Sequence, residues 1–189
     1  MRVAWSVTLL LSALAALDGV APSLADGADV LARYEQTAIA YFLNEADPVT
    51  GLVKDRAANF GEDAYTVSSL AATGFGLACL PIAAKRGWLP SDEAQEQARV
   101  TLDYLLHDSP HEHGWYYHFV DMRTGARVWN CELSSIDTAL LVAGALTAGA
   151  AFGGEVDALA TAIYERVDFP WMLTDGGAKP ESLTLCHGW

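Results

Sequence analysis

Residues 130–146, NCELSSIDTALLVAGAL, place Asp137 at the start of an almost wholly apolar run, with Glu132 just upstream. Apolar residues at nearly every position from 139 onward predict a buried helix over roughly 135–152. Ser134 and Asp137 also match a capping box, in which the serine caps the first turn and the acidic residue reaches back to the serine backbone N–H. Asp137 is therefore either part of a helix cap or a carboxylate placed for chemistry where an inner helix begins.

Four further segments on either side of this stretch have helical patterns. Segments 29–46, 91–106 and 155–167 are amphipathic, with Ser91 as the expected cap of the second of them. Segment 66–86 is apolar nearly all round and closes at Gly87, and Pro81 is expected to kink it or end its regular part. Amphipathic helices that alternate with apolar ones are what a double-layered α/α toroid requires, so the sequence predicts an all-α fold.

The segment between the third and fourth helices is rich in aromatic residues. An arm that begins at Trp115, a Thr124-Gly125 turn and an arm over 127–129 predict a small β-hairpin insertion. Gly and Pro break up residues 168–189, which are expected to form a loop or hairpin.

The apolar helix over 133–152 is about long enough to cross a bilayer. Asp137 lies within it, Gly and Ala outnumber Leu and Ile, and no basic cluster flanks it. These features favour a protein interior over a membrane span.

The amino-terminal residues 1–25 have the pattern of a secretory signal peptide. Arg2 precedes an apolar run, and Ser23-Leu24-Ala25 has the form of a cleavage site. The domain is then expected over 26–189, in an exported protein that is periplasmic or secreted and has no membrane anchor after cleavage. Three cysteines, Cys79, Cys131 and Cys186, leave at least one without a partner in the chain, and a Cys131–Cys186 disulfide stays open.

The formal net charge of −13 narrows the classes of partner. Such a surface repels phosphate backbones and anionic lipid, so nucleic acid and membrane surfaces are poor partners. A neutral ligand such as a sugar meets no such repulsion. The charge does not indicate the oligomeric state, which stays unknown.

Three carboxylates are candidates for acid–base chemistry: Asp137, Glu132 and Asp55. The structural alternative for Glu132 is an exposed loop acid or a partner of Arg127. The alternative for Asp55 is a local ion pair with Arg56 or a cap. A helix N-terminus stabilises an anion and suits Asp137 to the role of a base, whereas a general acid would require desolvation by neighbouring tryptophans.

Aromatic and histidine side chains crowd the same region. The hairpin aromatics either stack on sugar rings beside the carboxylates or roof the helical core; they are Trp115, Tyr116, Tyr117, Phe119 and Trp129. Four histidines and a glutamate are also close in sequence: His107, His111, Glu112, His113 and His118. An H-x-H pattern without an ordered scaffold is a weak signal, so neither a metal site nor a cofactor is predicted.

Several blocks resemble the bacterial glucoamylase-like family, which is related to endo-β-1,2-glucanases and to domains near cyclic β-glucan synthases. They are YFLNEADPVTGLVKDR, SSLAATGFGLACLPIAAKRGWL, GWYYHFVDMRTGARVWNCELSSIDTALLVAGAL and IYERVDFPWMLTDGG with LTLCHGW. The resemblance implies an (α/α)6 toroid that hydrolyses β-glucan, in particular β-1,2-linked glucan, by carboxylate acid/base catalysis with inversion. It implies catalytic roles for Asp137, Asp55 and Glu132. The implied substrate-binding residues are Arg56, Trp115, Tyr117, His118, Trp129 and Trp171.

Length is the main departure from the family. Members have roughly twelve helices, whereas five are predicted here before Trp189. The chain therefore resembles an amino-terminal half, an incomplete toroid in which truncation is expected to impair activity. Two alternatives stay open: a non-catalytic carbohydrate-binding or envelope protein, and an enzyme that makes glucan by transglycosylation.

Overall fold

The computed structural model describes residues 24–61, 63–178 and 183–189. By contacts the chain divides into two compact units, residues 1–35 and 36–189. Helix α2 (Leu24–Asn44) begins in the first unit and continues into the second. The predicted signal peptide, residues 1–25, lies outside the described residues except for Leu24 and Ala25, which are the first residues of α2.

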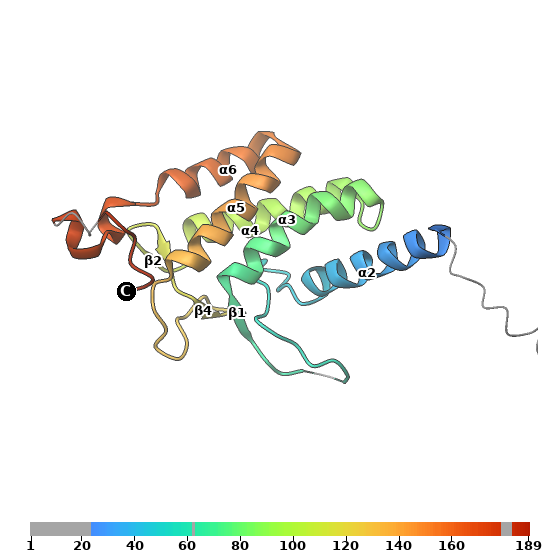
Figure 1. Ribbon diagram of the computed structural model, residues 1–189, viewed down its shortest axis with the longest axis horizontal. Helices are drawn as coiled ribbons and strands as arrows, with labels where there is room; N and C mark the ends of the chain where they lie inside the picture. Colours follow the sequence, from blue (N-terminus) through green and yellow to red (C-terminus); the bar gives the residue numbers. More distant parts are fainter. Residues whose placement is uncertain (1–23, 62, 179–182) are drawn as a thin grey trace, which may run out of the picture. The chain divides into compact units, whose positions relative to one another are not determined.

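The second unit is mainly helical, as the sequence predicts, with two small sheets. After α2 its helices are α3 (Leu70–Arg86), α4 (Ser91–His107), α5 (Ser135–Phe152) and α6 (Gly154–Glu165). The strands are β1 (Val67–Ser69), β2 (His111–Glu112), β3 (Trp115–Tyr116) and β4 (Phe119–Asp121), and two 3-10 helices follow α6, η1 (Pro170–Met172) and η2 (Thr174–Gly177). The strands lie at the end of the helices where α3 and α5 begin (Figure 1).

Serine caps start both apolar helices. Ser69 and Ser134 have extended backbones, and the hydroxyl of each accepts a hydrogen bond from a backbone N–H in the first helical turn. Glycine ends both: Gly87 closes α3 in the left-handed conformation, and Gly153 follows α5. The helix α3 continues through Pro81 to Arg86, so the expectation that proline ends its regular part is wrong.

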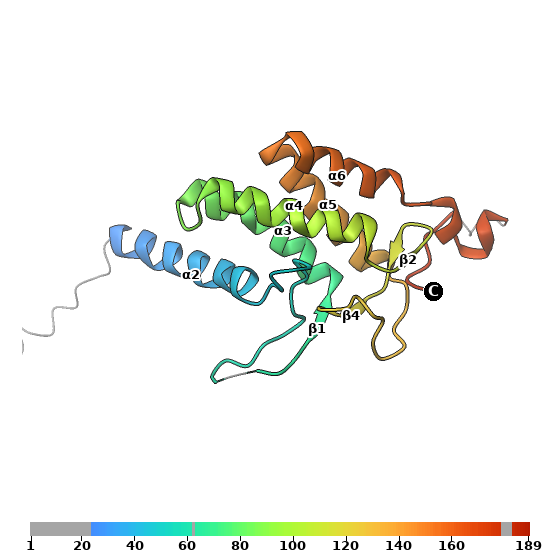
Figure 2. The same cartoon turned by 180° about the vertical axis from the view of Figure 1, so that it is seen from behind.

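α3 and α5 touch backbone to backbone because glycine lies at the crossing. A Cβ atom built on Gly144 would lie 1.9 Å from the Gly74 carbonyl oxygen, and one on Gly74 would lie 2.4 Å from the Leu140 carbonyl oxygen. No residue larger than glycine fits at this distance without separating the helices. The pair forms the centre of the unit, with their N-termini at the same end (Figures 1 and 2).

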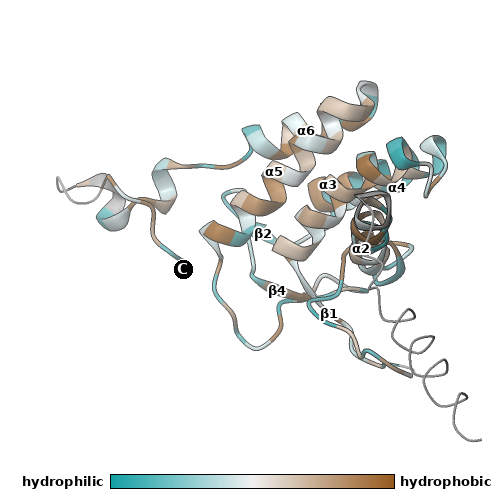
Figure 3. Cartoon of the chain, turned by 45° about the vertical axis from the view of Figure 1, so that its right-hand side comes forward, coloured by the Kyte–Doolittle hydropathy of each residue, from teal (hydrophilic) through white to brown (hydrophobic). Residues whose placement is uncertain are grey.

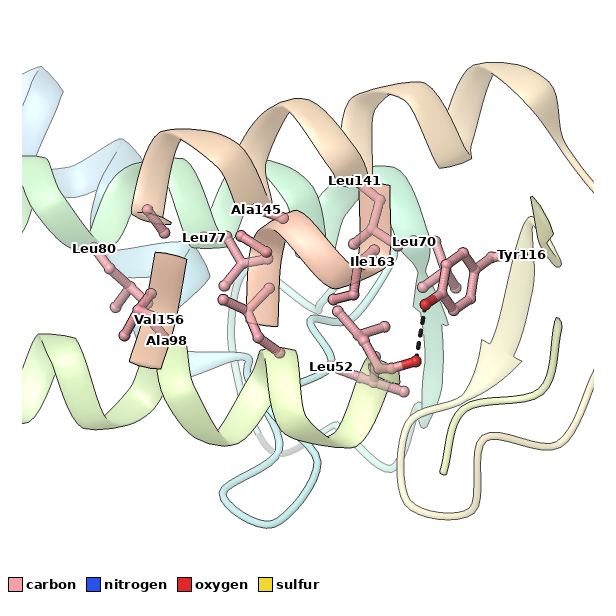
Figure 4. Packing of buried hydrophobic residues seen from close by; sticks show 14 of the residues in the cluster. Leu52, Leu70, Leu77, Leu80, Ala98, Tyr116, Leu141, Ala145, Val156 and Ile163 are labelled. Carbon is pink, nitrogen blue, oxygen red and sulfur yellow. Dashed lines mark hydrogen bonds between the residues drawn. The ribbon is translucent and has the colours of Figure 1, made fainter. Parts of the chain in front are cut away.

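The amphipathic helices α4 and α6 pack on this pair with their apolar faces. Buried leucines and alanines of α3, α4, α5 and α6 form one core, which Leu52 and Tyr116 close at the strand end (Figure 4). The phenol of Tyr116 donates to the Leu105 carbonyl over 2.8 Å and accepts from Arg166. Because burial outweighs the effect of that guanidinium, the pKa of Tyr116 rises to about 12.

One stripe of α5 has no covering element in the part of the chain that the structure describes. Ile136 is 54% exposed, Leu140 36% and Leu146 37%, and the helical repeat places all three on one broad face of α5. Figure 3 shows the apolar colour of this helix. By length and composition Ser135–Phe152 also passes for a membrane span, yet it packs against α3 and α6 as a core helix does.

The aromatic segment differs from the predicted hairpin in its pairing. The Thr124-Gly125 turn is present, and Val120 bridges to Arg127 across it. β4, however, pairs antiparallel with β1, a strand within the segment predicted as helix, and β2 pairs with β3. Three residues that precede α3 therefore hold the aromatic segment against the start of both apolar helices.

Three smaller expectations are also resolved. Ser91 is the first residue of α4 and Pro90 occupies its cap position without a side-chain hydrogen bond, so the predicted Ser91 cap is wrong. The three cysteines are free thiols, so no Cys131–Cys186 disulfide forms. Leu173 bridges to Leu185, so the described residues of the carboxyl-terminal segment pair as in the expected loop or hairpin.

Candidate functional site

The Asp137 carboxylate lies where the N-termini of α3 and α5 meet. Its side chain is 9% exposed. The Ser134 hydroxyl donates to Oδ2 over 2.6 Å, and the Ser69 hydroxyl donates to Oδ1 over 3.4 Å. One donor thus comes from the cap of each helix. Hydroxyl donors and two helix N-termini are complementary to a carboxylate anion.

The two interpretations of Asp137 prove to be linked. Ser134 is the cap, because its hydroxyl accepts the Asp137 backbone N–H over 3.1 Å. The reciprocal half of the capping box is missing, since the Ser134 N–H donates to the Tyr116 carbonyl and not to the Asp137 carboxylate. The carboxylate of Asp137 instead accepts the hydroxyl proton of its own cap and faces outward from the helix end, toward His118.

His118 lies between two of the candidate carboxylates. Its Nδ1 is 3.0 Å from Oε1 of Glu132, and its Nε2 is 3.6 Å from Oδ1 of Asp137. The Glu132 side chain accepts a hydrogen bond from its own backbone N–H and pairs with His118, and these interactions hold the pKa of Glu132 below its usual range despite partial burial. Glu132 is thus a partner of His118, not of Arg127 as one alternative had it.

Asp55 belongs to an adjoining cluster of polar and aromatic groups. Its Oδ2 is 3.2 Å from Nε of Arg56 and accepts from the Tyr65 hydroxyl over 3.4 Å. The Arg56 guanidinium lies 5.1 Å from the Tyr65 ring centre and 5.9 Å from that of Trp129. The local ion pair that the sequence suggested for Asp55 is therefore present, beside an aromatic ring that is 58% exposed.

Trp129 is held outward by an uncommon backbone conformation. Trp129 and Asn130 are consecutive non-glycine residues with φ of 55° and 52°. Such residues are sparse in proteins and cost on the order of 1–3 kcal/mol each, and they concentrate at binding sites. An exposed ring kept in place at this cost is a ready surface for a flat ligand face.

Phe119 connects the two clusters. Its ring stacks on His118 with centroids 3.6 Å apart and meets Trp129 edge-on at 5.1 Å. Asp137, His118, Phe119, Trp129 and the Arg56 cluster therefore form one contiguous series of contacts along β4 and its neighbours. The structure brings the candidate carboxylates into a single region.

The remaining predicted substrate-binding residues take different positions. Trp115 is 1% exposed and its indole N–H donates to the Asp168 carbonyl, so this ring belongs to the interior and offers no free face. Tyr117 is half-buried, and Arg127 lies 4.7 Å from its ring centre. Trp171 lies between His113 and Trp189, with ring centres 4.6 and 5.3 Å away.

The histidines that are close in sequence diverge in space. His107 pairs with Asp103, while His113 lies 3.5 Å from an Asp168 oxygen, and Nδ1 of His111 accepts the Gly114 N–H. No group of three or more His, Cys, Asp or Glu side chains suited to a metal ion occurs among the described residues.

Sequence reasoning missed three residues of this region: Ser69, Tyr65 and Phe119 as the connecting ring. Ser69 had a detectable signal, because two serines before an apolar helical run mark a cap. A cavity of about 300 Å³ lies elsewhere, between α2, α3 and α4. Its walls are mostly apolar and include none of the candidate carboxylates.

Comparison with solved structures finds the same fold in glucan-active proteins. The endo-β-1,2-glucanase of Chitinophaga pinensis, solved with sophorotriose and glucose, has a TM-score of 0.66 and 23% identity over 82% of this chain and 38% of its own. A β-1,2-glucanase from Parabacteroides distasonis has a TM-score of 0.67 and 21% identity over 82% of this chain and 22% of its own. A candidate glucoamylase from Bacteroides uniformis has a TM-score of 0.67 and 17% identity over 82% and 38%.

These likenesses establish a shared fold. The chain spans well under half the length of the structures that it resembles, so it looks like part of a glucoamylase-like protein. No family model matches the sequence, and no curated protein matches it.

Proposed function

We propose that the chain is part of a glycoside hydrolase-like protein that hydrolyses β-glucan and that it supplies the carboxylates for acid–base catalysis. The first substrate to test is β-1,2-linked glucan. The proposed architecture is part of an (α/α)6 toroid in which α3 and α5 are inner helices. Two glucanases with β-1,2 specificity in their names share its fold, and this supports the choice of substrate.

The observation that carries this proposal is the surroundings of Asp137. A carboxylate with 9% side-chain exposure lies at the junction of two helix N-termini, within reach of an imidazole. An exposed tryptophan lies a few contacts away. Carboxylates beside aromatic rings suit a sugar, since the ring faces stack on the apolar side of a pyranose while the acids act on its glycosidic oxygen.

In an inverting reaction one carboxyl group donates a proton to the glycosidic oxygen as the C–O bond breaks. A second carboxylate takes a proton from the water that attacks the anomeric carbon from the opposite face, and the two lie about 6.5–9.5 Å apart. Asp137 fills one role in this scheme, and Asp55 or Glu132 fills the other. The residues proposed to contact the sugar are Arg56, Tyr117, His118, Trp129 and Trp171. Trp115 is left out, because it is buried in a hydrophobic cluster.

The test is reducing-sugar release from β-1,2-glucan by the wild-type chain and by Asp137→Asn. Loss of a group that transfers a proton in the transition state lowers kcat by about 10²–10⁴-fold. Asp103→Asn, which changes a half-exposed carboxylate on α4, is the matched control and should leave the rate unchanged. Full activity in Asp137→Asn would refute the assignment.

The same assay separates the alternatives. A carbohydrate-binding protein without turnover would bind glucan saturably, lose affinity in Trp129→Ala and be indifferent to Asp137→Asn. A transglycosylase would form new glucan chains or rings, which product analysis detects. Export of the protein stays a proposal too, and amino-terminal sequencing of the protein from an expressing bacterium would find a start near Asp26.

A further inference from the structure

His118 has one carboxylate at each ring nitrogen. Its Nδ1 is within hydrogen-bond distance of Glu132, at 3.0 Å, whereas its Nε2 is 3.6 Å from Asp137. The histidine is 31% exposed in its side chain and Glu132 is 37% exposed, so solvent or a ligand reaches both. The Asp137 side chain, at 9% exposed, is enclosed more than either, and its Oδ1 is the oxygen near Nε2.

The ring of His118 is fixed in orientation by its neighbours. Phe119 stacks on it at 3.6 Å with an interplanar angle of 18°. The backbone N–H of His118 also donates to the Glu132 carbonyl over 3.0 Å, so the two residues are joined by main chain and side chain together. Glu132 is itself held by the backbone pairing of Leu133 with Trp189. This frame leaves little freedom for the Glu132 carboxylate except to face Nδ1.

The consequences follow from the proton count of imidazole. A charged ring donates through both nitrogens, toward Glu132 and toward Asp137. A neutral ring has a single N–H, and the hydrogen bond made by one nitrogen decides which nitrogen carries it. The shorter contact, with Glu132, places that proton on Nδ1 and leaves the Nε2 lone pair facing the space beside Asp137.

We infer that Glu132 is a positioning residue, which orients His118 and sets its tautomer, and that Asp137 and Asp55 are the two reacting carboxylates. This inference rests on the proposed function and narrows it, because the second reacting carboxylate is then Asp55. In this assignment Glu132 affects the reaction through the imidazole of His118. In Glu132→Gln the amide oxygen could still accept a hydrogen bond from the Nδ1–H of His118, so a positioning role would survive. An acid or base must itself gain and lose a proton, which an amide cannot do.

Nuclear magnetic resonance of the ring nitrogens tests the positioning without any need for turnover. Long-range ¹⁵N–¹H spectra are recorded at a pH where His118 has lost its charge, with the signal assigned from His118→Gln. His111 is an internal reference of the opposite tautomer, because its Nδ1 accepts the Gly114 N–H and its proton must be on Nε2. We expect His118 to carry its proton on Nδ1 in the wild type and in Glu132→Gln, and mainly on Nε2 in Glu132→Ala.

An unchanged His111 signal shows that Glu132→Ala has folded. If His118 keeps the same tautomer in the wild type and in Glu132→Ala, Glu132 does not set it and the inference fails. If Glu132→Ala does not fold, the Gln variant still decides, because a change of tautomer in Glu132→Gln would contradict the role of an acceptor at this position.

Activity provides the second readout. Glu132→Gln should retain kcat to within about 10-fold of the wild type, and Glu132→Ala should lose about 10–100-fold, as is usual for residues that orient a functional histidine. Asp137→Asn and Asp55→Asn should each lose more than about 100-fold. A loss in Glu132→Gln as large as in Asp137→Asn would identify Glu132 as a reacting group. If the wild type releases no sugar, the proposed function fails while the tautomer measurement still decides the role of Glu132.

Discussion

Replacing Gly144 by alanine is expected to destabilise the chain through the contact between α3 and α5. The added Cβ would lie 1.9 Å from the Gly74 carbonyl oxygen and 2.5 Å from its carbon. Ordinary van der Waals contacts of a Cβ atom begin at about 3.4 Å, so the helices must separate by about 1.5 Å at their crossing. No rotamer change relieves this clash, because both of the atoms struck belong to backbone.

The expected loss of stability in Gly144→Ala is the difference between two effects. Overpacking of a dense core costs about 1–3 kcal/mol, and a backbone clash lies at the upper end of that range. Alanine in place of glycine within a helix returns about 1 kcal/mol. The net loss is about 2 kcal/mol, which lowers Tm by about 4–8 °C for a chain of this size.

Urea and thermal unfolding, followed by circular dichroism and tryptophan fluorescence, measure this loss. Gly149→Ala is the matched control in the same helix, because its Cβ would meet its nearest atoms at 3.1 Å and neighbours need yield only a few tenths of an ångström. Stability should fall in the order Gly149→Ala, Gly74→Ala, Gly144→Ala. A Gly144→Ala variant at least as stable as the wild type would show that the helices do not touch through their backbones.

Three further changes have expected outcomes. Trp129→Ala should weaken glucan binding about 10-fold in titration calorimetry, since it removes a stacking surface of about 1.4 kcal/mol, whereas the exposed Tyr164→Ala on α6 should not. The raised pKa of Tyr116, about 12, means that its contribution to stability is complete below about pH 10 and is lost as the pH rises toward 12. Tyr116→Phe should flatten this alkaline loss in circular dichroism. It should also lower stability by about 1–3 kcal/mol, because a buried guanidinium N–H of Arg166 loses its acceptor and the Leu105 carbonyl keeps only its hydrogen bond from Arg166. The lowered pKa of Glu132 means that its ionised carboxylate stabilises the fold above about pH 4.3, and that this stabilisation is lost as the pH falls through the folded-state pKa. The free energy of unfolding of Glu132→Gln should therefore depend less steeply on pH below about 4.3 than that of the wild type.

The helices and their order could be predicted from sequence because their signals are local. Periodic apolar residues, serine before an apolar run and glycine after it mark α3 and α5 within a few residues. The strand pairing could not be predicted in this way. β1 is three residues long and continues directly into α3, so its residues read as the start of a helix, and its partner lies about fifty residues further along the chain.

The candidate site was predicted in its residue types but not in its connections. Asp137, Asp55 and Glu132 stood out as acids in apolar or loop surroundings, and the structure sets them along one series of contacts. Trp115 had the same sequence signal as Trp129, yet one is buried and the other exposed. Trp115 lies on β3, both of whose residues are buried, whereas the left-handed turn at Trp129 holds its ring outward. That turn involves neither glycine nor proline and leaves no mark in the sequence.

The dual use of the serine hydroxyls ties folding to reactivity. Each hydroxyl has one proton to donate and gives it to Asp137, while its oxygen closes the first turn of a helix. A substitution of either serine that changes the pKa of Asp137 would therefore also destabilise the first turn of α3 or α5. Substitutions at positions 69 and 134 are thus restricted by two requirements, the hydrogen bond to the Asp137 carboxylate and the cap of the helix.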